Sequence, residues 1–230
     1  MAQKNKKVSE AKEQQVTMEE TLNRWEEFFE KNKNGIITAL CIVVILIVGI
    51  FLYQSKVVKP RETRVAEYLF PAENYFMAGD YKTALEGNGA DVPGLLEIAD
   101  EYSNTKAGKL AAAYAGLSYA QLDSCDIAIS YLKKFNGKDQ MVAPAVLNAL
   151  ADCYASTDQL AKAAETFLLA AKKADNGLIS PYSLFQAGLI YEAMGKPAEA
   201  LKLYKRIKVE YPMSDQAVTI DEYITRVTAK

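Results

Sequence analysis

The chain has 230 residues, of which 50% are apolar and 24% charged, a balance typical of a protein with a folded core. The net charge is −2 and no basic stripe stands out, so a nucleic-acid partner is not expected. The sequence contains no histidine, which excludes Ser-His-Asp and Cys-His nucleophile systems and most catalytic zinc sites.

Residues 1–34 are predicted to form an N-terminal tail that contains one short amphipathic helix. Thr17–Glu20 fits a capping box, and the apolar residues that follow at spacings of four, three and four share one helical stripe: Met18, Leu22, Trp25 and Phe29. Such a helix could lie on the membrane, dock on a protein, or merely lead into the next segment. Its acidic face would be repelled by anionic lipid, which favours a protein.

A transmembrane helix is predicted over residues 35–55. No charge occurs between Lys33 and Lys56, and the apolar run 36–53 has 18 residues. As a helix this run would span roughly 27 Å, close to the thickness of a bilayer's hydrocarbon core. Tyr53 lies where an interfacial aromatic residue is expected. The lipid bilayer is therefore an expected partner of residues 36–53.

Two other interpretations of this run are less favourable. A cleaved signal peptide usually has a shorter apolar region and a small-x-small cleavage site, and no such site follows Tyr53. A soluble core helix usually has a polar face. The orientation stays open because three basic residues flank one end (Arg24, Lys31, Lys33) and four flank the other (Lys56, Lys59, Arg61, Arg64).

A repeated pattern follows the apolar run. Tyr119, Tyr154 and Tyr191 recur at spacings of 35 and 37 residues, and each follows a small residue by three positions: Gly116, Ala151 and Gly188. A second set of small residues aligns in the same way, and each is followed four positions later by a large one: Ala128 and Leu132, Ala163 and Phe167, Ala200 and Tyr204. Small residues let paired helices approach closely, and the large ones fill the space between them.

This pattern resembles the tetratricopeptide repeat, a unit of two antiparallel helices. The resemblance implies an α-solenoid, so that the predicted fold is all-α, with the transmembrane helix followed by this solenoid. An ordinary bundle of Ala- and Tyr-rich helices is the alternative, and three units in register disfavour it. The predicted repeat domain covers 56–230, with a degenerate first unit at 62–103, repeats at 109–142, 144–177 and 181–214, and a capping helix at 215–228.

The first unit is degenerate for three reasons. Pro71 falls where an apolar helical residue belongs, although Tyr75 and Gly79–Tyr81 fit the pattern. Glu86–Gly89 is expected to cut the second helix short. A further helix is predicted from about Pro93 to Tyr102.

The order of features resembles a narrower family. A WEEFFEKNK stretch precedes the apolar run, YFMAGDYKTAL and GLLEIADEYSNTKAGKLAAAYAG follow it, and the repeats end in LKLYKRIKVEYP. These features are similar to those of YfgM-like proteins, ancillary subunits of the SecYEG translocon. The resemblance implies a bacterial inner-membrane protein with one span, a cytoplasmic tail and a periplasmic repeat domain. It also implies three kinds of protein partner: the translocon, a periplasmic chaperone or prolyl isomerase, and nascent secreted chains.

No motif indicates catalysis. Ser130–Lys133 and Ser9–Lys12 match S-x-x-K, but neither has the partner motifs of that chemistry. Gly108, Gly137 and Gly195 each precede a lysine, but no Ser or Thr follows the lysine as a P-loop requires. The three cysteines, Cys41, Cys125 and Cys153, are expected to be small unpaired thiols. We therefore expect no enzyme, no cofactor and no metal.

A concave face made by the first helix of each pair is the expected partner-binding surface. Carried over from the resemblance slot by slot, its residues are Leu110, Ala113, Leu117, Asn148, Asp152, Tyr182, Phe185, Leu189 and Glu192. Tyr182 and Phe185 lie one turn apart and could clamp a bound segment, or else pack against the C-terminal helix at Ala217–Val227.

The sequence thus predicts a membrane-anchored protein-interaction scaffold that assists export or folding through the Sec translocon. The alternative is an assembly scaffold for the cell envelope or division complex that binds no client.

Overall fold

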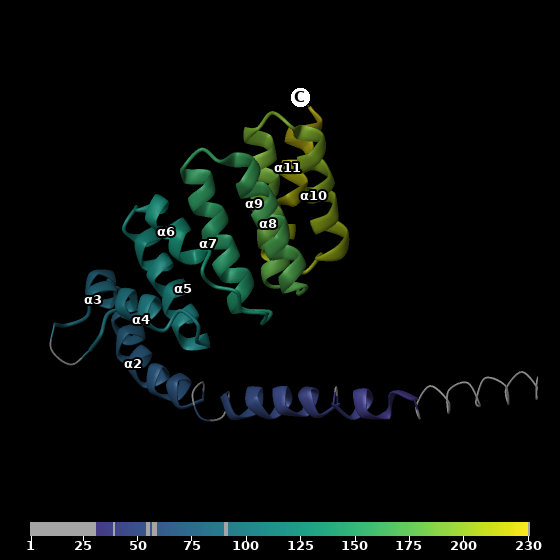
Figure 1. The fold of residues 1–230 in the computed structure, drawn as a ribbon. Helices are drawn as coiled ribbons and strands as arrows, with labels where there is room; N and C mark the ends of the chain where they lie inside the picture. Colours follow the sequence, from purple (N-terminus) through teal and green to yellow (C-terminus); the bar gives the residue numbers. More distant parts are fainter. Residues whose placement is uncertain (1–30, 39, 54–55, 57–58, 90–91, 230) are drawn as a thin grey trace, which may run out of the picture. The chain divides into compact units, whose positions relative to one another are not determined.

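The computed structural model describes residues 31–229 except 39, 54–55, 57–58 and 90–91 (Figure 1). The amphipathic helix predicted within the N-terminal tail lies outside these residues. Contacts divide the chain into two units at Lys59 and Pro60. Each unit is described by itself below.

The first unit contains an apolar helix, Lys31–Tyr53. It has 23 residues and a mean hydropathy of 3.1 over its most apolar 18-residue window, none of which is buried. In the part of the chain that the structure describes, it is the one helix whose length and composition suffice to cross a membrane. Burial would be expected of a soluble core helix, and the exposed surface of this helix does not favour that interpretation. A signal sequence would meet the same criteria.

The second unit begins with three helices around one apolar cluster. They are α2 (Lys59–Met77), α3 (Tyr81–Glu86) and α4 (Leu95–Glu101). Val65 and Leu69 of α2 pack with Leu95 and Ile98 of α4. Pro71 lies inside α2 and does not end it, although it removes one backbone donor. The second helix is short, as the sequence predicts from Glu86–Gly89.

Seven further helices follow as three antiparallel pairs and a last single helix (Figure 1). The pairs are α5 (Lys106–Gln121) with α6 (Cys125–Leu132), α7 (Val142–Ser156) with α8 (Leu160–Ala174), and α9 (Ile179–Ala193) with α10 (Pro197–Glu210); α11 (Asp215–Thr228) ends the chain. Each helix packs on the next in sequence. The domain is therefore an all-α solenoid, and among the described residues the only β pairing is an isolated bridge between Gly87 and Pro93.

Small and large residues meet inside each pair as the sequence predicts. A Cβ atom at Gly116 would lie 2.6 Å from Cγ of Leu132, and one at Gly188 would lie 2.3 Å from Cε1 of Tyr204. Ala151 and Phe167 share a buried cluster in the middle pair. These three contacts confirm the predicted slots, since no larger residue would fit without separating the helices.

The turn inside each pair has one repeated geometry. The residues with positive φ are Gly79, Asp123, Asp158 and Gly195. The next residue in each turn donates its N–H to the carbonyl of a recurring tyrosine, at 2.8–3.0 Å: Tyr75, Tyr119, Tyr154 and Tyr191. This is a Schellman-type helix end. The turn between α2 and α3 is the same, so the degenerate first repeat keeps the turn geometry of the complete pairs.

Helix α6 differs from its counterparts in length. It has 8 residues, whereas α8 has 15 and α10 has 14. The predicted repeat 109–142 therefore ends in a non-helical connection, residues 133–141, that leads into α7. This connection matters for the surface described below.

Candidate functional site

The helices form two rows that are spaced differently. In the row of first helices, α5 approaches α7, α7 approaches α9 and α9 approaches α11. In the row of second helices, neither α6 and α8 nor α8 and α10 approach in the same way within the described residues. Because the first row is the more closely spaced, the solenoid curves toward it. We call the inner side of α5, α7 and α9 the A-helix face.

Two of the predicted binding residues are buried and serve the fold instead. Ala113 is 1% exposed and packs in the cluster between α5, α6 and α7. Asn148 is 9% exposed, and its Oδ1 accepts a buried hydrogen bond of 2.8 Å from Oγ of Ser183. This bond joins α7 to α9. Because both side chains are buried in the structure, we leave them out of the accessible surface considered below.

Phe185 and Glu192 are engaged with the C-terminal helix. The ring of Phe185 lies 4.7 Å from that of Tyr223 on α11, centroid to centroid, and 6.0 Å from that of Tyr204. Glu192 accepts a hydrogen bond of 2.7 Å from Oη of Tyr204 and forms a 2.6 Å ion pair with Arg226. Phe185 therefore packs against the C-terminal helix, one of the two interpretations left open by the sequence, and it stays half-buried like Tyr182.

The other five predicted residues remain accessible. Leu110, Leu117, Tyr182 and Leu189 are half-buried, and Asp152 is exposed. Surrounding protein nevertheless desolvates the Asp152 carboxylate and raises its pKa, a combination expected for a group inside a concavity. Desolvation and the charge of Asp152 also raise the pKa of Tyr182. The negative charge of Asp152 on α7 therefore acts on the phenol of Tyr182 on α9.

The A-helix face offers a carboxylate, a phenol and apolar side chains. No group of three potential metal ligands occurs among the residues that the structure describes. Such a surface can hold another protein by apolar contact and hydrogen bonds, and nothing in its geometry suggests a covalent step.

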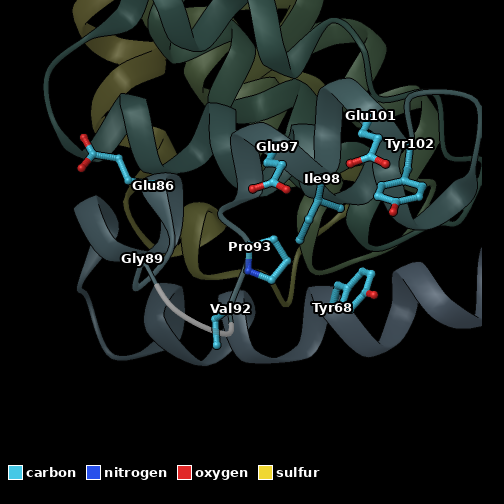
Figure 2. A pocket seen from close by; sticks show the side chains of 9 residues that line it. All are labelled: Tyr68, Glu86, Gly89, Val92, Pro93, Glu97, Ile98, Glu101 and Tyr102. Atoms are coloured by element: carbon cyan, nitrogen blue, oxygen red, sulfur yellow. The ribbon is translucent and has the colours of Figure 1, made fainter.

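A cavity of about 450 Å³ lies at the start of the second unit and is lined by residues of α2, of α4 and of the connection that precedes α4 (Figure 2). Tyr68 and Tyr102 lie at the same end of the lining, and Glu97 and Glu101 of α4 also belong to it. Desolvation, followed by the neighbouring charge of Glu101, raises the pKa of Tyr102. The cavity has an acidic rim, and no further observation indicates a ligand for it.

A second cavity, of about 590 Å³, lies at the start of α5 beside the connection 133–141. Its lining includes Lys106, Lys109 and Lys138, together with Leu110, the one residue of the predicted binding set that reaches it. We call it the lysine pocket. Sequence reasoning missed it, although the available signal was two Gly-Lys dipeptides, at Gly108 and Gly137, on either side of a shortened helix.

The comparison with protein families bears on the last complete pair. Residues 182–214 match the tetratricopeptide repeat family model. The last complete pair is therefore similar in sequence to a tetratricopeptide repeat. The match covers the region where the sequence predicts the repeat 181–214, and the small-to-large contact of Gly188 with Tyr204 lies inside it.

Solved structures show the same architecture. Two crystal structures of nearly identical tetratricopeptide-like repeats, from a Podosopora anserina protein assigned as a candidate kinesin light chain, match with TM-scores of 0.54 and 0.53. Both are 15% identical in sequence, cover 73% of this chain, and are themselves covered to 87% and 86%. At this identity the likeness establishes the fold alone. No curated protein sequence matches the chain at a significant level.

Proposed function

We propose that the chain is a membrane-anchored scaffold that binds proteins on the A-helix face of its tetratricopeptide domain. The observation that carries this proposal is the set of accessible side chains on that face: Leu117, Tyr182 and Leu189 are half-buried and Asp152 is exposed. A partner that covers the apolar side chains and donates a hydrogen bond or a positive charge to Asp152 would fit this surface.

The apolar helix supports the anchoring part of the proposal. Its described side chains are exposed except that of Ile36, which is half-buried, and a bilayer would cover them. A tether of this kind keeps a weak binding surface at high effective concentration beside other membrane proteins. A scaffold with modest affinity would then suffice.

The finer proposal is an ancillary role at the Sec translocon, with the tetratricopeptide domain on the periplasmic side of a bacterial inner membrane. It is supported by the resemblance of the order of features to YfgM-like proteins. Emerging secreted chains, or a chaperone or prolyl isomerase that acts on them, would then be the partners.

Site-specific photo-crosslinking in intact membranes tests both levels. A photoreactive amino acid would replace Tyr182 on the A-helix face. The matched control would replace Glu165, an exposed residue of α8 in the outer row. We expect crosslinks to translocon subunits or secreted chains from position 182 and few from position 165.

Equal crosslinking from both positions would remove the A-helix face as the binding surface. Crosslinks to division or cell-wall proteins from position 182 would support the alternative assembly role. A cysteine placed at Lys230 and probed with a membrane-impermeant reagent gives the topology. Protection from the reagent in intact spheroplasts would end the translocon-exit proposal.

A further inference from the structure

We propose that the lysine pocket binds a short acidic peptide segment that carries one apolar side chain between carboxylates. This inference rests on the proposed function as a protein-binding scaffold and names the chemistry of one partner segment. It adds a second contact region at the end of the A-helix face, which shares only Leu110 with the predicted binding residues.

The pocket exists because α6 is short. The helix ends at Leu132, and the chain returns to α7 through residues 133–141 instead of another helical turn. Space is thereby left between the start of α5 and the start of α7, where the other two pairs have helix. Phe135 fills part of this space, and about 590 Å³ stays open.

The connection that closes the pocket is held in place by neighbouring elements. Nζ of Lys173 on α8 donates to the carbonyl of Gly137 at 3.2 Å. The Oδ1 atom of Asp139 accepts hydrogen bonds from the N–H groups of Met141, Val142 and Ala143 at the start of α7. The pocket wall is therefore preorganised, which lowers the entropic cost of binding.

The lining of the pocket carries three lysine ammonium groups. None of the ammonium groups of Lys106, Lys109 and Lys138 forms an ion pair with a described residue. Glu62 reaches Lys106 only at its backbone N–H, at 2.8 Å. The one carboxylate in the lining, that of Asp139, is committed to the α7 backbone. Three cations with one committed anion favour an acidic ligand.

The floor of the pocket is apolar. Leu110 and Phe135 are half-buried, and Val142 is exposed. An apolar side chain of the ligand would cover these three residues, while flanking carboxylates would reach the lysines. A free phosphate would meet only the charges and leave the floor uncovered. A bilayer would meet a recessed floor that a flat surface cannot fill.

Fluorescence anisotropy on the full chain in phosphatidylcholine nanodiscs tests the inference. The probe is a short labelled peptide with one phenylalanine flanked by glutamates. Two control peptides replace the glutamates by glutamine, or the phenylalanine by serine. We expect saturable binding of the first peptide only, weakened by added NaCl because the contacts are partly exposed to solvent.

The matched variants change three lysines to glutamate. In the test variant these are Lys106, Lys109 and Lys138; in the control they are Lys196, Lys202 and Lys205, which are exposed and do not line the pocket. The test variant should lose affinity by about tenfold or more, because each exposed ion pair contributes modestly and three are reversed. The control should bind like the parent chain.

Circular dichroism identifies a test variant that has lost its fold, and the milder change of the same three lysines to glutamine then takes its place. Equal binding by test and control variants would overturn the inference. So would absence of binding by the parent chain, equal binding of the serine peptide, or lysine-dependent binding of short-chain phosphatidylglycerol without peptide binding.

The two proposals fail separately. If the peptide binds through the three lysines while position 182 yields no translocon crosslink, the pocket stands and the Sec role falls. If position 182 crosslinks as expected but the peptide does not bind, the pocket inference alone is wrong.

Discussion

At the scale of single residues, the fold depends on backbone positions that few side chains tolerate. The four turn residues with positive φ are two glycines and two aspartates. Glycine adopts this region without steric cost, and aspartate tolerates it better than most residues. The aspartates at 123 and 158 therefore replace the glycine of the last pair without changing the turn.

Gly195→Ala is expected to destabilise the domain by about 1 kcal/mol, because its left-handed backbone penalises a Cβ atom. A Cβ atom there would meet nothing within 4 Å, so the cost comes from the backbone alone. Urea unfolding of the variant measures the loss. Gly177→Ala is the matched control, since Gly177 also has open space but no positive φ. An equal loss in both variants would contradict the explanation.

Tyr114 is expected to make stability fall at alkaline pH. Desolvation, with a hydrogen bond to Glu73, raises its pKa to about 12. The folded state therefore favours the neutral phenol, whose contribution is complete below the unfolded pKa near 10 and is lost as the pH rises toward 12. Thermal unfolding between pH 9 and about 12 should show a steeper fall for the parent chain than for Tyr114→Phe. If the stability of the two proteins fell in parallel with pH, Tyr114 would not be the cause of the alkaline loss.

At the scale of elements, α11 covers the end of the solenoid. Ile220 is buried against the cluster that contains Tyr204 and Ile207 of α10, and Tyr223 packs on Phe185 of α9. Repeat arrays need such a terminal element because the last pair would otherwise expose its apolar side. The sequence predicted this helix at 215–228, and the structure has it at Asp215–Thr228.

Ile220→Ala is expected to cost about 2–4 kcal/mol, since it leaves a cavity under α11. Val218→Ala on the same helix should cost almost nothing, because Val218 is 83% exposed. Denaturant unfolding compares the two variants. If the two losses were alike, α11 would not be acting as a cover for the cluster.

At the scale of the whole molecule, the proposed function needs both units in one chain. In that proposal the apolar helix would supply the location, and the repeat domain would supply the binding surface. Neither unit alone would hold a weak partner beside a membrane complex.

Ile45→Arg with Val48→Arg is expected to release the full chain from membranes under alkaline carbonate extraction. An arginine at the centre of a span costs about 2.5–3.5 kcal/mol of insertion free energy. The matched control, Val209→Arg with Val218→Arg, places the same charges on exposed positions of the tetratricopeptide domain and should leave the chain in the pellet. A shortened soluble product from the parent chain would instead indicate a cleaved signal sequence.

The predictions from sequence succeeded where the contacts lie inside one repeat. The small residues at 116, 151 and 188 and the large ones at 132, 167 and 204 were found from spacing, because each pair of helices packs locally through them. Whether the predicted binding residues contact a partner stays a prediction, but their burial differs from residue to residue. Ala113 and Asn148 proved buried because contacts between neighbouring repeats, such as the bond from Ser183, depend on the angle at which repeats stack.

The sequence by itself determined the helical repeat, the order of the elements and the apolar helix, since periodicity and local packing decide these features. The tertiary structure alone decided which residues of the A-helix face stay accessible and how α11 packs on Phe185. It also decided where the shortened α6 leaves space for the lysine pocket. Each of these depends on side chains distant in sequence, and their meeting is set by the packing of one repeat on the next.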